Sequence, residues 1–172
     1  VLGAIVEYRD VESGEHIQRV KGYTKILAEA FRVQYPEYGL TENTIDTIVA
    51  ASALHDLGKI AIPDRILLKP GRLDKDEFEY MKSHTIRGCE ILESMKVEWN
   101  PAMKEISLEI IRHHHERYDG KGYPDGLKGD EIPISAQLVS VADVYDALIN
   151  ERCYKDAYSK EDAFHMIMNG EC

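Results

Sequence analysis

Apolar side chains recur at helical spacing through almost the whole chain, and this periodicity constrains its fold more than any other feature. The first such face comprises Ile17, Val20, Thr24, Leu27 and Phe31. Spacings of three and four residues place side chains on one side of an α-helix. The turn-forming residues from Pro36 to Gly39 then end this first segment. The pattern predicts an all-α protein.

Capping residues and helix breakers divide the rest of the chain. Asp74 with Glu77 resembles a capping box, Asn100 precedes a proline at the first helical position, and Ser159 pairs with Asp162. Pro63-Asp64 and Pro70-Gly71 mark a predicted loop. The segment from Asp119 to Pro133 holds four glycines and two prolines, which predicts a second, irregular loop. Five helices are expected after the first. They extend from near Thr41 to His55-Asp56, from Asp74 through His84 to Ile91, from Asn100 to the consecutive histidines His113–His115, from about Ile134 to Asn150, and from about Ser159 to Asn169.

Length and composition describe one ordinary soluble domain. The 172 residues, 44% of them hydrophobic and 30% charged, are enough to bury a core, and we expect residues 1–172 to form a single domain. Cys89, Cys153 and Cys172 lack metal or redox spacing and predict free thiols in a cytoplasmic protein. A net charge of −10 argues against a general nucleic-acid binder. No apolar stretch approaches the roughly 18 residues of a membrane span.

Histidine and carboxylate residues occur in five separated segments. Each occurrence has an ordinary explanation by itself, such as a hydrogen-bonded core histidine or a solvated aspartate. Taken together, the ordinary explanations would require five segments to place such residues inward by accident. Nitrogen and oxygen ligands without cysteine suit Fe, Mn or Zn in an open hydrolytic site. The candidates are Glu12 with His16, His55 with Asp56, His84, two of the three residues His113, His114 and His115, and Asp143.

Three of these candidates carry specific geometric arguments. Glu12 and His16 are four residues apart and share a helical face, whereas Asp143 lies in an apolar helix, where an unpaired carboxylate would be costly. His84 falls on one stripe with Phe78 and Met81, which predicts that it faces inward. Helix geometry alone leaves His113/His114 and His114/His115 as rival ligand pairs.

Four long motifs carry a resemblance to a known family. HDLGKIAIPDRILLKPGRL begins at His55, MKSHTIRG contains His84, HHERYDGKGYPDGLKGDEIP begins at His114, and VADVYDALINERCYK contains Asp143. They resemble the HD-GYP family of bacterial phosphodiesterases, from Asp10 to about Ser159. The triad Gly122-Tyr123-Pro124 is the signature that separates this family from other HD-domain hydrolases. The resemblance implies an HD-type helical bundle whose irregular loop carries the Gly-Tyr-Pro motif.

The resemblance also assigns roles to residues. It implies two or three divalent metal ions, with Fe or Mn expected, and it selects the pair His114 and His115 while leaving His113 out. Asp56 is expected to bridge two metals and Glu12 to serve a third. Lys59, Tyr123, Arg152 and Lys155 are expected to contact substrate. The implied metal ligands are Glu12, His16, His55, Asp56, His84, His114, His115 and Asp143.

The implied reaction is hydrolysis of cyclic di-GMP to linear pGpG by a hydroxide shared between metals, and the resemblance leaves open whether pGpG is cut again to GMP. Asp56 and Lys59 are the expected catalytic residues. Alternatives are another HD-type reaction, such as hydrolysis of cyclic GMP-AMP or di-iron oxygenation, and a catalytically silent module that binds a cyclic dinucleotide or a partner. Degenerate relatives usually lose ligands, whereas this chain keeps every one.

Two departures from the family pattern stand out. Cys153 occupies the place of the usual proline in the family's Arg-Pro-Tyr motif, which affects local loop shape and removes no ligand. The family commonly carries a sensor or receiver domain, so we expect the chain to be part of a larger regulatory protein. Diguanylate cyclase domains that contact the Gly-Tyr-Pro loop are a further expected partner.

Overall fold

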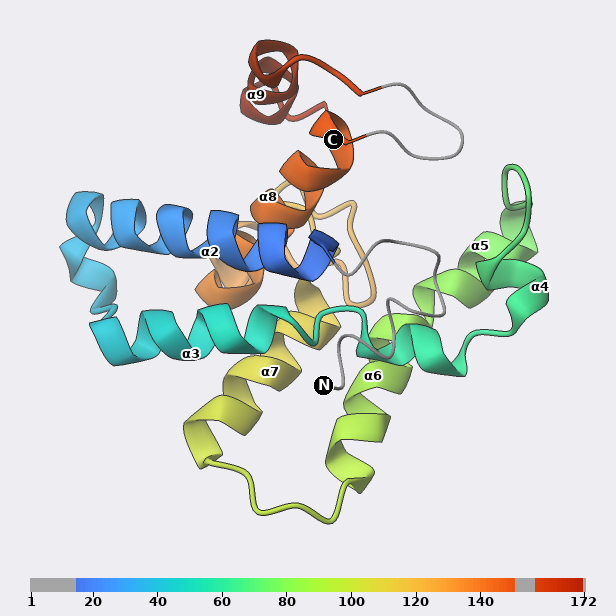
Figure 1. The fold of residues 1–172 in the computed structure, drawn as a ribbon, viewed down its shortest axis with the longest axis horizontal. Coiled ribbons are helices and arrows are strands. Elements are labelled where there is room, and N and C mark those ends of the chain that lie inside the picture. Colours follow the sequence, from blue (N-terminus) through green and yellow to red (C-terminus); the bar gives the residue numbers. More distant parts are fainter. Residues whose placement is uncertain (1–14, 151–156, 172) are drawn as a thin grey trace.

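The computed structural model describes residues 15–150 and 157–171, and all regular structure within these ranges is helical (Figure 1). The predicted all-α fold is confirmed. The α-helices are α2 (Glu15–Gln34), α3 (Glu42–Ser52), α4 (Asp64–Leu67), α5 (Lys75–Lys82), α6 (His84–Ser94), α7 (Pro101–His113), α8 (Ile134–Ile149) and α9 (Lys160–Met168). Short 3-10 helices are η1 (Pro36–Tyr38), η2 (Leu57–Ala61) and η3 (Gly129–Glu131).

The predicted helix starts are confirmed by their caps. Asp74 accepts the backbone N–H of Glu77, and the Glu77 carboxylate accepts that of Asp74 in return, which completes a capping box. Asn100 caps α7 ahead of its first-turn proline, and the Ser159 hydroxyl caps α9. These side chains satisfy N–H groups that the helix itself leaves without partners.

The main core lies where α2, α3, α7 and α8 meet. Buried side chains from these four helices form one apolar cluster that includes Val20, Ile48, Ile110 and Val139. A smaller cluster joins the turn after α3 to α6 and α7. Figure 1 shows α2 and α3 side by side, linked through η1, with α8 crossing α2 and α9 at the top of the view. The ends of these packed helices place the histidine-rich turns.

The helix predicted from Asp74 through His84 to Ile91 is two helices. α5 ends at Lys82, and Ser83 donates both its N–H and its hydroxyl to the carbonyl of Tyr80, which closes the helix end. α6 then begins at His84. The prediction that His84 faces inward is confirmed, because His84 is buried, but Phe78 does not share that inward stripe, since it is 48% exposed.

Two smaller corrections concern the segment before α5. α3 ends at Ser52, so His55 and Asp56 lie in the turn that leads into η2 and not, as predicted, at the end of the helix. A short helix, α4, also forms in the segment predicted as a loop after Pro63.

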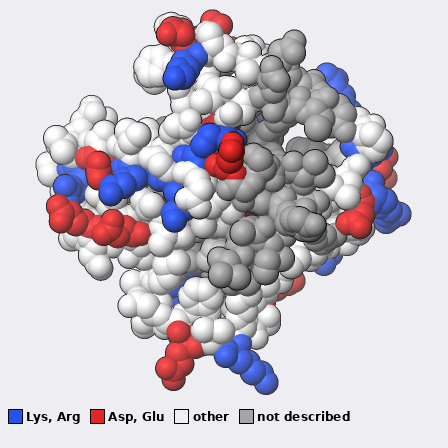
Figure 2. Space-filling view, viewed as in Figure 1, with Lys and Arg blue, Asp and Glu red and all other residues white. Residues whose placement is uncertain are grey.

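The described surface in Figure 2 shows Lys and Arg side chains interspersed with Asp and Glu. Although the net charge is −10, the acidic residues therefore do not form one continuous patch on the described part of this face. No helix within the described ranges is both long and apolar enough to cross a membrane.

Candidate metal centre

Three histidines are held with the same ring nitrogen facing the protein backbone. Nδ1 of His55, of His84 and of His114 each donates to a carbonyl oxygen three or four residues earlier. The acceptors are Ser52 at 2.7 Å, Met81 at 2.9 Å and Ile110 at 3.0 Å. A neutral ring that donates through Nδ1 carries its lone pair on Nε2, and such backbone bonds fix the orientation of a ligand ring. In its neutral form, each ring therefore offers the lone pair of Nε2 to a cation.

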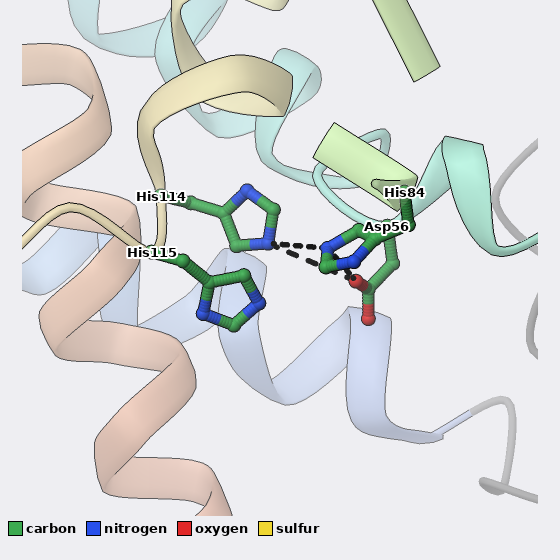
Figure 3. A group of neighbouring side chains, drawn as sticks. All are labelled: Asp56, His84, His114 and His115. Carbon is green, nitrogen blue, oxygen red and sulfur yellow. Dashed lines mark hydrogen bonds and ion pairs between the residues drawn. The ribbon is translucent and has the colours of Figure 1, made fainter. Parts of the chain in front are cut away.

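Asp56 lies between these rings. Its Oδ1 is 3.4 Å from Nε2 of His84 and 3.7 Å from Nε2 of His114. Figure 3 shows the Asp56 carboxylate beside these rings. Its Oδ2 is 3.4 Å from Nε2 of His55 and 2.9 Å from Nζ of Lys59. The two carboxylate oxygens therefore face different histidines.

A second carboxylate completes the far side of the site. Asp143 Oδ1 lies 3.5 Å from Nε2 of His16 and 3.9 Å from Nε2 of His55. α8 supplies Asp143, the first turn of α2 supplies His16, and the turn after α3 supplies His55. Five sequence-predicted segments, apart from the position of Glu12, thus converge on one region.

The donor atoms form two groups that share Asp56. One group holds Asp56, His84, His114 and His115, and the other holds His16, His55 and Asp56; within each group the donor atoms lie within 4.8 Å of one another. In the part of the chain that the structure describes, His55 Nε2 and Asp56 Oδ1 are buried without a hydrogen-bond partner. Such atoms are costly to bury, and a divalent cation would satisfy both. The donor set fits two metal ions.

The pKa values follow from this crowding. Burial lowers the pKa of His84 to about 4, so its ring is neutral and available as a ligand. Burial also lowers the pKa of His55, but the nearby carboxylates of Asp56 and Asp143 outweigh it and raise the pKa to about 9. A metal bound at Nε2 of His55 must therefore displace a proton.

Burial disfavours the charge of Asp56, but the Lys59 ammonium and the His55 ring outweigh it and hold the pKa of Asp56 well below its usual range. The carboxylate is therefore charged and ready to bind cations.

His113 faces away from this centre. Its Nδ1 lies 3.5 Å from Asp125 Oδ2 and 4.0 Å from Glu116 Oε1. α7 ends at His113, so His114 and His115 follow in a turn, where consecutive side chains can approach one site. Of the rival pairs, the structure places His114 and His115 with Asp56.

The trio His113, Glu116 and Asp125 forms a third group of potential ligands. Its carboxylates are already used, however. Glu116 accepts three backbone N–H groups, and Arg112 donates two hydrogen bonds to Asp125. This trio is better explained as a brace for the following loop.

That loop carries Gly122-Tyr123-Pro124. The buried Glu116 carboxylate accepts the N–H groups of Asp125, Gly126 and Leu127 at 2.7–3.1 Å. A Cβ on Gly122 would lie 2.4 Å from Cα of Glu116, so a larger residue could not pack there. The loop thereby places the Tyr123 ring on the ring of His115, with centroids 4.8 Å apart and planes 25° apart.

Two residues in the site were not predicted. Asp146 is buried and accepts a hydrogen bond from Nδ1 of His16 at 2.7 Å, while Arg19 donates to both of its oxygens at 2.6 and 3.0 Å. Asp146 therefore holds His16 as the backbone carbonyls hold the other rings. The pattern that pointed to Asp143, a carboxylate within an apolar helix, could also have pointed to Asp146, because both residues lie in α8. Glu116 lies inside the recognised motif but was not singled out.

Three predicted site residues lie outside the described residues. They are the proposed metal ligand Glu12 and the proposed substrate contacts Arg152 and Lys155.

Comparison with known proteins identifies the fold family. The family model described as HD domain matches residues 13–171. A probable cyclic di-GMP phosphodiesterase of Vibrio cholerae is 45% identical over 98% of this chain and 39% of its own length. A cyclic di-GMP phosphodiesterase of Thermotoga maritima is 46% identical over 97% of this chain and 42% of its own.

A third relative, the Vibrio cholerae 3′3′-cGAMP-specific phosphodiesterase 2, is 44% identical over 97% of this chain and 30% of its own length. The chain thus spans less than half the length of these curated relatives. The shared sequence nevertheless includes the helical frame and its histidine-rich turns, and the chain belongs to the HD-domain family and to its HD-GYP group.

Proposed function

We propose that this chain is a metal-dependent phosphodiesterase that hydrolyses cyclic di-GMP. The observation that carries the proposal is the position of Asp56, whose two oxygens face two separate groups of histidines. A carboxylate so placed could hold two cations side by side, an arrangement that stabilises both the attacking and the leaving oxygen of an in-line displacement at a phosphodiester. Two relatives that share this region are named for cyclic di-GMP hydrolysis.

His84, His114 and His115 would hold one metal, and His16, His55 and Asp143 the other, with Asp56 shared. Fe or Mn suits this set of imidazoles and carboxylates. When bound, such ions lower the pKa of water and stabilise the developing charge on a phosphoryl group. A third ion would depend on Glu12.

Lys59 is the proposed catalytic cation of the chain itself. Its ammonium lies 2.9 Å from Asp56 Oδ2, at the edge of the donor set. From that position it would neutralise a non-bridging phosphate oxygen as negative charge builds in the transition state. Tyr123 is proposed to line the substrate cleft, since its ring covers His115. Arg152 and Lys155 are proposed to contact substrate on the strength of the motif alone.

Cyclic GMP-AMP is a second candidate substrate. A relative named as specific for 3′3′-cGAMP is 44% identical, close to the 45% and 46% of relatives named for cyclic di-GMP. Overall identity therefore does not choose between the nucleotides. Both bring two purine bases and two phosphates, so the same metal centre could cleave either.

The test is product analysis with protein loaded with Fe(II) or Mn(II) under anaerobic conditions. We expect cyclic di-GMP to give pGpG first and GMP later, and His84→Gln to lose turnover together with metal. His165→Gln is the matched control, because His165 is exposed on α9. Full metal occupancy without cleavage of either cyclic dinucleotide would reject the proposal in favour of a silent binding module.

A further inference from the structure

The helix α5 has an unusual surface beside the metal centre. None of its residues is buried, and Phe78 keeps 48% of its surface exposed. A single exposed apolar side chain is common and needs no function. Phe78 differs because its neighbours are Lys82 and Tyr123, and the Tyr123 ring stacks on the proposed metal ligand His115.

The aromatic rings form a series that leads outward from the proposed ligands. His115 stacks on Tyr123, and the Phe78 ring meets Tyr123 edge to face, with centroids 6.4 Å apart and planes 80° apart. Tyr123 is thus held between a proposed metal ligand and an exposed ring. A molecule that reaches the metals from this side would pass Phe78.

A cation accompanies the two outer rings. The Lys82 ammonium lies 5.6 Å from the ring centroid of Phe78 and 5.6 Å from that of Tyr123, within the range of a cation–π interaction. It also forms an ion pair with Glu79 at 2.7 Å, and its side chain is about one quarter exposed. Positive charge and aromatic surface therefore occur together on this side of the site.

We infer that Phe78, Tyr123 and Lys82 form a subsite for one nucleotide unit of the substrate. A purine base would stack on the exposed face of Phe78, and Lys82 would contact the adjoining phosphate. Proteins bind unpaired nucleotides in this way, with aromatic faces for the bases and cations for the backbone. A cyclic dinucleotide would place one phosphodiester at the metals, which leaves its two bases and its second phosphate to contact other surfaces of the chain. This inference rests on the proposed function.

The first test changes the aromatic surface. Phe78→Leu keeps an apolar side chain and removes the ring, so the KM for cyclic di-GMP should rise about tenfold with kcat and metal content unchanged. Phe78→Trp should restore the affinity. This pattern is the signature of binding energy that acts equally on ground and transition states. Phe164→Leu is the matched control, since Phe164 is an exposed phenylalanine on α9.

The second test changes the cation. Lys82→Gln should raise KM about threefold to tenfold at low salt and less at high salt, because screening weakens a charge contact at the surface. Lys25→Gln is the control, since Lys25 is likewise paired with a glutamate, Glu29, on an exposed helix face.

The outcomes separate this inference from the function on which it rests. If the wild-type chain cleaves cyclic di-GMP and both Phe78→Leu and Lys82→Gln keep its KM, the subsite is wrong and the function stands. A fall in kcat and metal content in Phe78→Leu, not rescued by Phe78→Trp, would also overturn the subsite, because it would show a structural role. If the metal-loaded wild-type chain neither binds nor cleaves a cyclic dinucleotide, both proposals fall.

Discussion

Gly58 and His84 touch through their backbones. A Cβ built on Gly58 would lie 1.7 Å from the carbonyl oxygen of His84 and 2.6 Å from the backbone nitrogen of Gly88. η2 therefore rests directly on the first turns of α6, with no side chain between them. Asp56 lies two residues before Gly58, and this contact brings its Oδ1 to 3.4 Å from Nε2 of His84.

Gly58→Ala should therefore push η2 away from α6 and separate Asp56 from His84. We expect a loss of about 1–3 kcal/mol in stability from overpacking, with a reduced metal content. Urea unfolding and elemental analysis measure the two effects. Gly22→Ala is the control, because nothing lies within 4 Å of its added Cβ, and alanine there should be neutral or slightly stabilising. Unchanged metal content and stability in Gly58→Ala would show that this contact does not position the site.

His113→Gln should keep the metal content, whereas His114→Gln should lose the metal in its group. The reason is that His113 faces Asp125, while Nε2 of His114 lies 3.7 Å from Asp56 Oδ1. Elemental analysis of the two purified variants makes the comparison. Loss of metal from His113→Gln alone would contradict the register described for the end of α7.

Asp146→Asn should weaken metal binding at the His16 group by about 10- to 100-fold, because the carboxylate orients the His16 ring. Chelator competition measures the affinity of each metal, and the His84 group should be little affected. Asp46→Asn, an exposed position on α3, serves as the control. Equal affinities in wild type and Asp146→Asn would show that the Asp146 carboxylate does not orient His16 for metal binding.

Glu116→Gln should destabilise the loop that carries Tyr123. The amide would turn a donor toward one of the three backbone N–H groups that the carboxylate accepts, at a cost of about 1–3 kcal/mol. Urea unfolding and the KM for cyclic di-GMP should both change, with Glu105→Gln as an exposed control on α7. A variant with wild-type stability and KM would show that the loop holds its shape without this brace.

The features that sequence predicts well here are local ones. The caps at Asp74, Asn100 and Ser159 each depend on residues within one helical turn, and each is present in the structure. The helix break at Ser83 was missed because apolar spacing continues through it. No local signal separates one long helix from two that meet at an angle.

The site residues likewise divide into those that sequence predicts and those that depend on contacts distant in sequence. His16, His55, His84, His114 and Asp143 were predicted from residue type, and the structure brings them together. Residue spacing alone could not choose between His113 and His115, because that choice depends on where α7 ends. Asp146 was missed because its role comes from a contact with α2, 130 residues away in sequence.

The central claim is that Asp56 joins two metal ions, and the most direct test is the metal stoichiometry of Asp56→Ala. The proposal predicts at least two ions per wild-type chain, and loss of metal from both histidine groups in the variant, with helical content by circular dichroism unchanged. Asp46→Ala, at an exposed position on α3, should keep the full complement. Full metal stoichiometry in Asp56→Ala would contradict the bridging role and with it the proposed mechanism.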